Sequence, residues 1–441
     1  MSFLNRMTKR LRWVLPVAAA AVIAGACELD VADPDVIQEE ELSGPAAVPT
    51  AINGVIGDLA TMTEHYALYS GMFTDEMILA GTFPTRVQVD ERRVLDSNAT
   101  ATGEVNETLQ TARRQAEQVV SNFNGFLGDD DFNQAQVRNG IAYGQYIEAI
   151  SELHLGELYC QIPVEGGGDP VSSNEIVSGA LSGFQEAQSA AADAGLQQWE
   201  YAAMVGEARA NLYLGNFDQA ASVASNVPTE HRLLVEFDTN SPAQFNKYFD
   251  LTWGSQNEVI RWTVGDGTQQ ERGSEKFAEY DDFVAWGIID PGFCSDCAFN
   301  SSIAVHQQLI YDEAADDIAL SNGAHARLIE AEAAIRNGAT GAAETLINDL
   351  RASWDDRWSA NRFGGVAEPD DISLTGNMQD DLLTLMGEYA RETWLTGTRQ
   401  ENLRRLVEEF GAGSDMDLYP EKEGDQICWP VPEQESTGAA P

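Results

Sequence analysis

Hydrophobic residues recur at three- and four-residue steps along most of the chain, which is the spacing of one face of an α-helix. Residues 106–127 carry one such stripe, and a second runs from Ile141 to Leu158. We expect Pro163 to end the second helix, because proline cannot continue a helix. Two further stripes fill residues 382–410 and are separated by Gly397. This pattern predicts a mainly α-helical protein.

A histidine, His154, lies on the second stripe between Ile150 and Leu158. Glu157 is the only potential partner one turn away, and no third metal ligand is close in sequence. A packed histidine is therefore expected here rather than a metal site.

Two turns are similar to those of tetratricopeptide units. In the segment GNFDQA, Gly215 lets the chain reverse and Ala220 lets two helices approach closely. A second such turn surrounds Gly338, with small residues at Ala342 and Ala343. Three or more units are needed for an independent solenoid, so these helix pairs are expected to pack into a larger domain.

The helical period is lost between about residues 241 and 321. NEVIRWTV predicts a short strand, and the segment after it is rich in Gly, Asp, Ser and aromatic residues. A loop this long inside a compact domain is usually functional. A sugar ring stacks its apolar face on aromatic rings, so aromatic residues outside helical stripes are candidate ligand contacts. In this segment they are Tyr280, Phe283, Trp286, Phe293 and Phe299.

A second candidate stretch, HYALYSGMFTDEMILAGTFPTR, ends in a proline-containing loop. It holds Tyr66, Tyr69, Phe83 and Arg86. For any single aromatic residue, packing in the core is the competing interpretation, so the grouping is stronger evidence than its members.

The N-terminus has the features of an export signal. A basic start is followed by about ten apolar residues, a length that suits a signal peptide and is too short to span a bilayer. The small residues Ala24, Gly25 and Ala26 then precede Cys27, as in bacterial lipoproteins, although Leu is commoner at the position of Ala24. Residues 1–26 are thus predicted to be removed and Cys27 to carry lipid, with ordinary secretion as the alternative. Residues 27–49 are predicted to be an acidic tether and 50–441 the folded domain.

Acidic residues dominate the composition, with 71 Asp and Glu against 26 Lys and Arg. Removal of four basic residues with the signal peptide takes the formal net charge from −45 to −49. Such a surface repels phosphate backbones and anionic headgroups, which disfavours nucleic-acid binding and leaves membrane contact to the lipid.

Four cysteines remain once Cys27 is lipidated, and an exported protein can form disulfides. Cys294 and Cys297 lack the strand–helix context of a thioredoxin motif and the second close pair of a zinc knuckle, so a local disulfide is favoured. Elimination then pairs Cys160 with Cys428.

No nucleophile elbow, HExxH motif or P-loop is present. Carboxylates are so abundant that neighbouring pairs have little value as evidence for glycosidase chemistry. We expect no catalysis, no cofactor and no metal site.

Several segments together resemble the SusD/RagB outer-membrane lipoproteins. In ARETWLTGTRQENLRRL, residues Arg391, Glu392, Gly397, Arg399, Leu403 and Arg405 stand at matching positions. Thr396 and Asn402 depart from the usual acids, which affects the local ion pairs but not the helix turn. Three further parts of the chain resemble segments of the same family and occur in the same order as in that family. They are LGELYCQIPV, LIEAEAAIRNG with LINDLRA, and the C-terminal CWPVPEQE.

The resemblance implies a mainly helical SusD-like fold with tetratricopeptide-like pairs as scaffold. It also implies a cell-surface, lipid-anchored protein that covers a TonB-dependent, SusC-like outer-membrane transporter and captures oligosaccharide or peptide nutrients. The alternative is a helical-repeat scaffold that binds other envelope proteins. A pure scaffold has no need of the aromatic loop, so nutrient capture is the favoured hypothesis.

Overall fold

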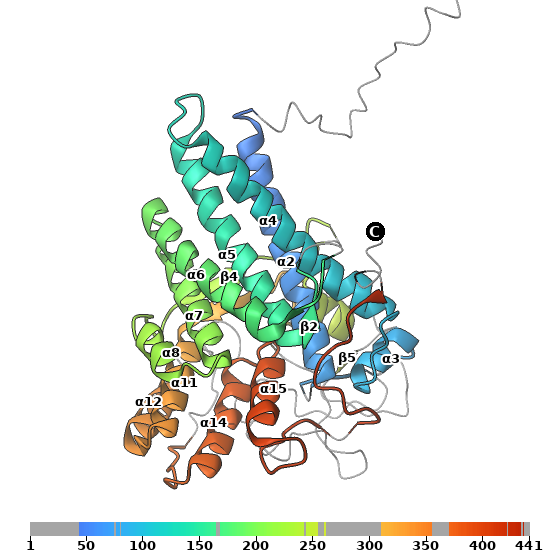
Figure 1. Ribbon diagram of the computed structural model, residues 1–441, viewed down its shortest axis with the longest axis vertical. Helices are drawn as coiled ribbons and strands as arrows, with labels where there is room; N and C mark the ends of the chain where they lie inside the picture. Colours follow the sequence, from blue (N-terminus) through green and yellow to red (C-terminus); the bar gives the residue numbers. More distant parts are fainter. Residues whose placement is uncertain are drawn as a thin grey trace, which may run out of the picture. The chain divides into compact units, whose positions relative to one another are not determined.

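Helices account for most of the residues that the computed structural model describes (Figure 1). These residues are 44–74, 76–79, 81–164, 168–241, 244–254, 260–261, 310–354, 370–420, 422–433 and 435. Residues 48–441 form one compact unit, and of residues 1–47 only 44–47 are described. The first helical elements are α2 (Ala47–Phe73), α3 (Pro84–Asp90), the π-helical η1 (Thr100–Asn106), α4 (Glu107–Phe126) and α5 (Gln134–Leu158).

The middle and C-terminal elements are also mainly helical. They are α6 (Ser173–Ala194), α7 (Gln197–Tyr213), α8 (Phe217–Ala224), the short α9 (Lys247–Phe249) with π-helical η3 (Asp250–Gly254), α11 (Gly323–Arg336), α12 (Thr340–Ala352), α14 (Met378–Glu392) and α15 (Arg399–Phe410). The mainly α-helical class predicted from the apolar stripes is confirmed.

The end of α5 corrects one sequence-based boundary. The helix stops at Leu158, five residues before Pro163, and Tyr159 already has an extended backbone. A proline favours extended backbone in the residue before it, and here Ile162 belongs to a short strand. The apolar stripe could not reveal this, because an extended segment that enters the core is as apolar as the helix before it.

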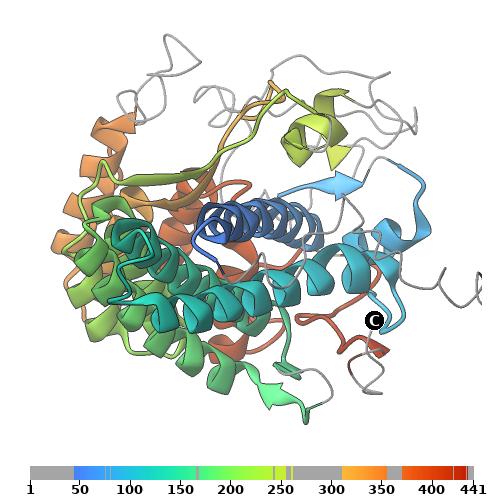
Figure 2. The same cartoon turned by 90° about the horizontal axis from the view of Figure 1, so that it is seen from above.

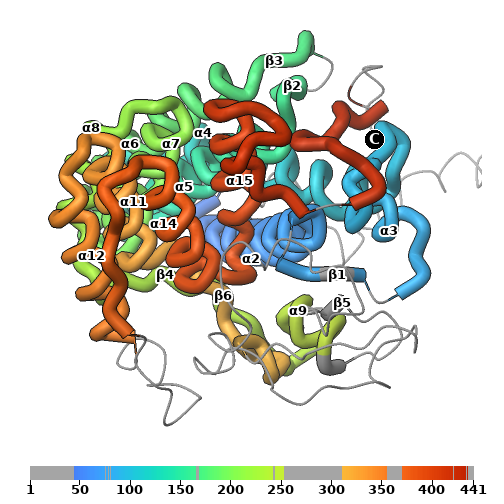
Figure 3. The backbone as a smooth tube through the Cα atoms, turned by 90° about the horizontal axis from the view of Figure 1, so that it is seen from below, coloured from blue at the N-terminus to red at the C-terminus, as the bar shows by residue number. Residues whose placement is uncertain are grey.

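Helix pairs form the scaffold, and the two predicted tetratricopeptide-like turns are present. Gly215 joins α7 to α8 with φ 77°, and Gly338 joins α11 to α12 with φ 71°. Both lie in the left-handed region, which glycine adopts without steric cost. Ala220 and Ala343 are fully buried, as expected of small residues where two helices meet. Figures 1 and 3 show α8, α11 and α12 side by side.

All three sheets of the described residues are two-stranded and antiparallel. They pair β1 (Ile78–Leu79) with β5 (Ile260–Arg261), β2 (Gln161–Ile162) with β3 (Val171–Ser172), and β4 (Arg232–Val235) with β6 (Ile318–Asn322). Ile260 and Arg261 are the only described residues of the segment NEVIRWTV, and both belong to β5; the rest of the predicted strand lies outside the described residues. In Figure 2, α2 runs past α4 near the centre of the view, with β1 beyond the C-terminal end of α2.

A disulfide joins the end of α5 to the C-terminal segment. Cys160 and Cys428 have an S–S distance of 2.04 Å and a Cα–Cα distance of 5.5 Å, so the long pairing predicted by elimination is present. Their neighbours Tyr159 and Trp429 form a parallel β-bridge beside it. Cys294, Cys297 and Cys27 lie outside the described residues. Within the described part of the chain, no helix combines the length and apolarity needed to cross a bilayer.

Candidate functional site

An aromatic and charged cluster surrounds the start of α3. The Arg86 guanidinium carbon lies 5.1 Å from the ring centroid of Phe83 and 5.8 Å from that of Tyr69. Arg86 Nη2 donates to Glu104 Oε2 at 3.3 Å, and the Tyr69 hydroxyl donates to the same oxygen. Tyr69 is fully buried, whereas Phe83 is 45% exposed. The cluster therefore extends from the core to the surface and presents an aromatic ring beside a guanidinium.

Local sequence explains how the surface end of the cluster is built. Pro84 occupies the start of α3, where its fixed φ suits the first helical turn and its missing N–H costs nothing. Phe83, just before it, has an extended backbone with φ −69° and ψ 114°. Arg86 follows three residues later and reaches the Phe83 ring.

The acidic side of the cluster comes from η1. Thr100 Oγ1 lies 3.3 Å from Glu104 Oε1 and 2.9 Å from Thr85 Oγ1, so η1 is tied to the first turn of α3. Asn98 supports this link by donating to the Thr85 carbonyl at 2.8 Å. The carboxylate is thereby held against the cationic side of the cluster.

Burial controls the protonation of the groups below the cluster. It lowers the pKa of His65, whose ring lies 6.2 Å from that of Tyr69, although the nearby Glu104 charge opposes this shift. Burial also raises the pKa of Glu64 to about 7, even though Glu64 accepts a hydrogen bond from the Lys247 backbone at 3.0 Å. Among the described residues of this cluster there is no serine, cysteine or threonine paired with a histidine, as acyl transfer would require.

The predicted aromatic segment connects to this cluster through β5. Ile78 pairs with Arg261 and Leu79 with Ile260, and Leu79 in turn donates its N–H to Asp90 of α3 at 3.2 Å. Residues 260–261, the last described before the predicted segment, are therefore paired with β1, which is itself hydrogen-bonded to α3. The aromatic candidates of that segment, namely Tyr280, Phe283, Trp286, Phe293 and Phe299, lie outside the described residues.

Tyr66 occupies a different position from the other candidates of its stretch. Its side chain is 1% exposed, and its ring stacks on His154 with a centroid distance of 3.7 Å. No face of the ring is open to a ligand, so Tyr66 is not included in the site proposed below. Tyr69 is 0% exposed and is likewise closed to a ligand, so it contributes to the cluster only by supporting Arg86 and Glu104.

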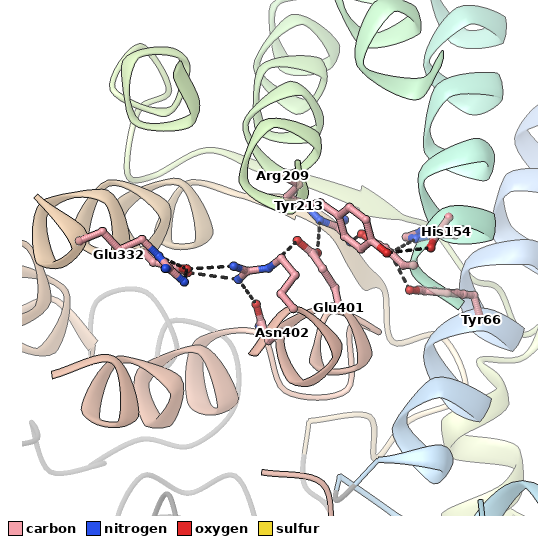
Figure 4. A network of polar contacts seen from close by, with 11 residues as sticks. Tyr66, His154, Arg209, Tyr213, Glu332, Glu401 and Asn402 are labelled. Carbon is pink, nitrogen blue, oxygen red and sulfur yellow. Dashed lines mark hydrogen bonds and ion pairs between the residues drawn. The ribbon is translucent and has the colours of Figure 1, made fainter. Parts of the chain in front are cut away.

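Tyr66 instead belongs to a buried polar network that the sequence did not reveal as a unit (Figure 4). Glu157 is completely buried and accepts from Tyr66 Oη at 2.6 Å and from Arg209 Nη2 at 2.6 Å. His154 Nδ1 lies 2.9 Å from the same carboxylate, and burial and Arg209 both lower the pKa of His154. The histidine is therefore neutral and packed, as its position on the stripe predicted. Arg209 also donates to Glu401 Oε2 at 3.2 Å.

The network continues across α15 to α11. Arg405 donates from two nitrogens to Glu332, at 2.9 and 3.1 Å, and to Asn402 Oδ1 at 3.0 Å. Arg336 adds a second cation to Glu332 at 2.9 Å. Burial favours the neutral form of Glu332, but the ion pairs with Arg405 and Arg336 outweigh it and lower the pKa. Arg405 thus pairs with Glu332 of LIEAEAAIRNG, a segment far away in sequence.

Arg404, the neighbour of Arg405, holds the end of α5. Its Nη1 lies 2.9 Å from the carbonyl oxygens of Gly156 and Tyr159, and its Nη2 donates to Ser173 Oγ at 2.9 Å. The last carbonyls of a helix have no partner within the helix, so this guanidinium replaces the missing donors. The two adjacent arginines therefore anchor α15 to different helices.

Comparison with known proteins identifies the fold. Neither a protein-family model nor a curated protein matches the sequence significantly. Many solved structures match: a SusD superfamily protein from Bacteroides vulgatus has a TM-score of 0.63 at 15% identity, covering 89% of this chain and 97% of its own. A SusD homolog from Bacteroides thetaiotaomicron has a TM-score of 0.63 at 11% identity, covering 91% and 97%.

A further similar structure is described as a SusD-like carbohydrate binding protein from Bacteroides vulgatus. Its TM-score is 0.56 at 14% identity, and the match covers 82% of this chain and 83% of its own. The fold of the present chain is therefore SusD-like, as the sequence motifs predicted.

Proposed function

We propose that this protein is a cell-surface lipoprotein of an outer membrane that captures an oligomeric nutrient and delivers it to a TonB-dependent, SusC-like transporter. The main support is that, within a SusD-like fold, α3 carries Phe83 and Arg86 of the cluster and is hydrogen-bonded to β1, which pairs with the strand that leads into the aromatic segment. A solved protein of this fold is described as carbohydrate binding. The ligand is proposed to be a glycan or a peptide, bound without chemical change.

The chemistry of the cluster suits such a ligand. A sugar ring or peptide side chain can stack on the exposed face of Phe83, while the partly exposed Glu104 carboxylate accepts hydrogen bonds from its polar groups. Arg86 is buried and positions Phe83 and Glu104 for this contact. The aromatic residues Tyr280, Phe283, Trp286, Phe293 and Phe299 are proposed to complete the site. The lipid on Cys27 is proposed as the contact with the membrane.

Calorimetry against a panel of neutral glycans and peptides tests this proposal. A stacked ring contributes about 1 kcal/mol beyond its buried area, so Phe83→Ala and Trp286→Ala should each raise the Kd about fivefold. Met378→Ala removes another exposed apolar side chain, at the start of α14, and should leave the Kd unchanged. Mass spectrometry of each ligand after incubation should show it intact.

Three outcomes would contradict the proposal. Detection of cleaved ligand would show that the protein is an enzyme. Equal binding by the wild type and both aromatic variants would show that neither Phe83 nor Trp286 contacts the ligand, and so would exclude the proposed site. The third outcome is an absence of binding across the panel together with a protein partner other than a transporter. It would favour the scaffold alternative, which the tetratricopeptide-like pairs α7–α8 and α11–α12 support.

A further inference from the structure

The C-terminal segment lies against the elements that carry the ligand cluster. We call its described residues 419–420, 422–433 and 435 the strap. Figures 1 and 3 show this part of the chain, in red, beside α3. Three sets of contacts join the strap to the residues that follow α3, to η1 and to the end of α5.

Arg92, two residues after α3, is the first link to the strap. Its side chain is 5% exposed, and its Nε and Nη2 donate to the Gln426 carbonyl at 2.9 and 2.7 Å. Nη1 donates to the Pro420 carbonyl at 3.2 Å, and the guanidinium carbon lies 4.1 Å from the ring centroid of Tyr419. Arg92 has a left-handed backbone with φ 55°, which is uncommon outside glycine. Such a conformation persists only where the surrounding contacts hold it.

Gln426 is the second link. Its Oε1 accepts from the Val94 N–H at 2.6 Å, and its Nε2 donates to the Val94 carbonyl at 2.9 Å. An amide side chain can satisfy both backbone groups because it carries a donor and an acceptor. Nearby, the Gly424 N–H donates to the Glu91 carbonyl at 2.8 Å. A Cβ atom on Gly424 would lie 2.1 Å from the Arg92 carbonyl oxygen, so the two backbones are in direct contact.

The end of the strap reaches η1. Glu433 N–H donates to the Asp96 carbonyl at 3.0 Å, in the loop between α3 and η1. Asn106 of η1 donates from Nδ2 to Glu435 Oε1 at 3.2 Å. Asn106 stands two positions after Glu104, the carboxylate of the ligand cluster. The strap therefore binds both elements of the cluster, the one that carries Phe83 and the one that carries Glu104.

The strap is itself fixed to the helical scaffold. Cys428 forms the disulfide with Cys160, two residues after the end of α5. The adjacent Trp429 N–H donates to the carbonyl of Leu158, the last residue of α5, at 2.9 Å. A covalent bond and a backbone hydrogen bond thus connect α5 to the part of the chain that holds α3 and η1.

We infer that Arg92 and Gln426 are positioning residues for the ligand cluster: they join the strap to α3 and η1 and so hold Phe83 beside the Glu104 carboxylate. Arg92 is buried, so it acts on a ligand through α3 rather than by contact. The inference rests on the nutrient-capture proposal, which assigns ligand binding to this cluster. Loosening these two links should weaken binding while the helical scaffold stays intact.

Hydrogen–deuterium exchange of the full mature chain tests the links without a ligand. Because Gln426→Leu removes two hydrogen bonds, exchange in peptides from residues 84–106 should rise about tenfold, with α6 and α7 unchanged. Gln134→Leu is the matched control. Gln134 is also a half-buried amide bonded to backbone groups, the Gly128 N–H at 2.9 Å and the Phe126 carbonyl at 3.0 Å, in the α4–α5 turn.

A pair of substitutions at Arg92 isolates its donors. Arg92→Met and Arg92→Lys both place an unbranched side chain on the same left-handed backbone, but only lysine keeps a cationic donor. Exchange in residues 84–106 should rise in Arg92→Met and be partly restored in Arg92→Lys. A general loss of packing at this buried position would instead affect the two variants equally.

Calorimetry with maltohexaose and cellohexaose, two neutral hexasaccharides, measures the effect on binding. Gln426→Leu should raise the Kd about fivefold, and Gln134→Leu should change it less than about twofold. Phe83→Ala should raise the Kd without changing exchange in residues 84–106, because Phe83 is proposed to contact the ligand rather than to hold α3.

The outcomes separate this inference from the proposed function. A rise in exchange that is equal in residues 84–106, α6 and α7 would overturn the inference, since the strap would then stabilise only the fold as a whole. Weaker binding by Phe83→Ala with unchanged binding by Gln426→Leu would overturn it too. Binding that is insensitive to Phe83→Ala would instead contradict the proposed ligand site. If neither hexasaccharide binds, hydrogen exchange alone decides whether Arg92 and Gln426 hold α3 and η1.

Discussion

At the scale of single residues, the core contains charged side chains that are shielded from water. Glu157, Glu332 and Arg209 are each at most 4% exposed. Burying a charge is costly unless it is paired and hydrogen-bonded, and each of these groups has at least one charged partner. Glu332 and Glu401 both pair with arginines, but their pKa values are shifted in opposite directions. The resulting difference in protonation can be measured.

Two matched substitutions should have unequal effects on stability. Glu332→Gln leaves Arg405 and Arg336 without their shared carboxylate, and breaking a buried ion pair costs about 3–5 kcal/mol. Burial and the neighbouring Glu157 charge raise the pKa of Glu401 to about 8, so Glu401→Gln replaces a mostly neutral acid with a neutral amide. We expect its loss in the free energy of unfolding, measured by urea denaturation at pH 7, to be much smaller.

Equal losses in the two variants would show that Glu401 is ionised in the folded protein. Glu236→Gln, at an exposed position just after β4, provides the background for a Glu-to-Gln change.

At the scale of elements, the ends of helices are fixed by distant parts of the chain. Arg404 of α15 supplies donors to the last carbonyls of α5, and the disulfide holds the residue two positions beyond that helix. The C-terminal segment adds the bridge between Tyr159 and Trp429. The path of the chain after α5 is therefore set by contacts with residues about 250 positions later.

Removal of the disulfide should destabilise the protein strongly. Cys160 and Cys428 are 268 residues apart, and chain-entropy arithmetic for a loop of that length gives about 5 to 6 kcal/mol. The double variant Cys160→Ser/Cys428→Ser should therefore have a clearly lower Tm in thermal unfolding. A reductant should lower the Tm of the wild type much more than that of the variant, which retains only the predicted short bridge between Cys294 and Cys297. An unchanged Tm in the double variant would show that the cross-link contributes nothing to stability.

At the scale of the whole molecule, the free energy of unfolding depends on pH through buried carboxyl groups. Burial raises the pKa of Glu64 and Glu152 to about 7 and that of Glu401 to about 8, from a usual value near 4.5. The folded protein thus holds protons that the unfolded chain has already released. Stability from these groups is lost as the pH rises through 7 and 8.

Histidines act in the opposite direction, but at lower pH. Burial lowers the pKa of the four described histidines, His65, His154, His231 and His325, so they favour the folded state increasingly as the pH rises toward 6.5. Above pH 7 the carboxyls dominate. The free energy of unfolding should fall by about 2 kcal/mol from pH 7 to pH 8.5, more than half of it from Glu401. Glu401→Gln should reduce this fall, and a rise over the same interval would contradict the assignment.

Anchoring to the membrane is also a property of the whole molecule. Lipid on Cys27 is proposed to hold the mature chain at the outer membrane, because several acyl chains anchor a protein durably. Cys27→Ser should therefore release soluble protein or leave uncleaved precursor in cell fractionation. A variant that loses its signal peptide and stays in the membrane fraction would rule out the lipid anchor.

Local patterns in the sequence determined the helical class, the two glycine turns and the packed position of His154. These features depend on residues within one or two helical turns of each other, so periodicity and residue type are sufficient to predict them. The motif ARETWLTGTRQENLRRL indicated the SusD-like fold for the same reason, since its residues are contiguous.

Only the tertiary structure decided which charged and aromatic residues act together. Arg405 meets Glu332 across 73 residues, and Arg209 meets Glu401 across 192, distances along the chain over which periodicity carries no information. Burial likewise separated Tyr66, in the core, from Phe83, at the surface, although both belonged to one predicted stretch. Which face of a helix is covered depends on what packs against it, and that is a property of the folded chain alone.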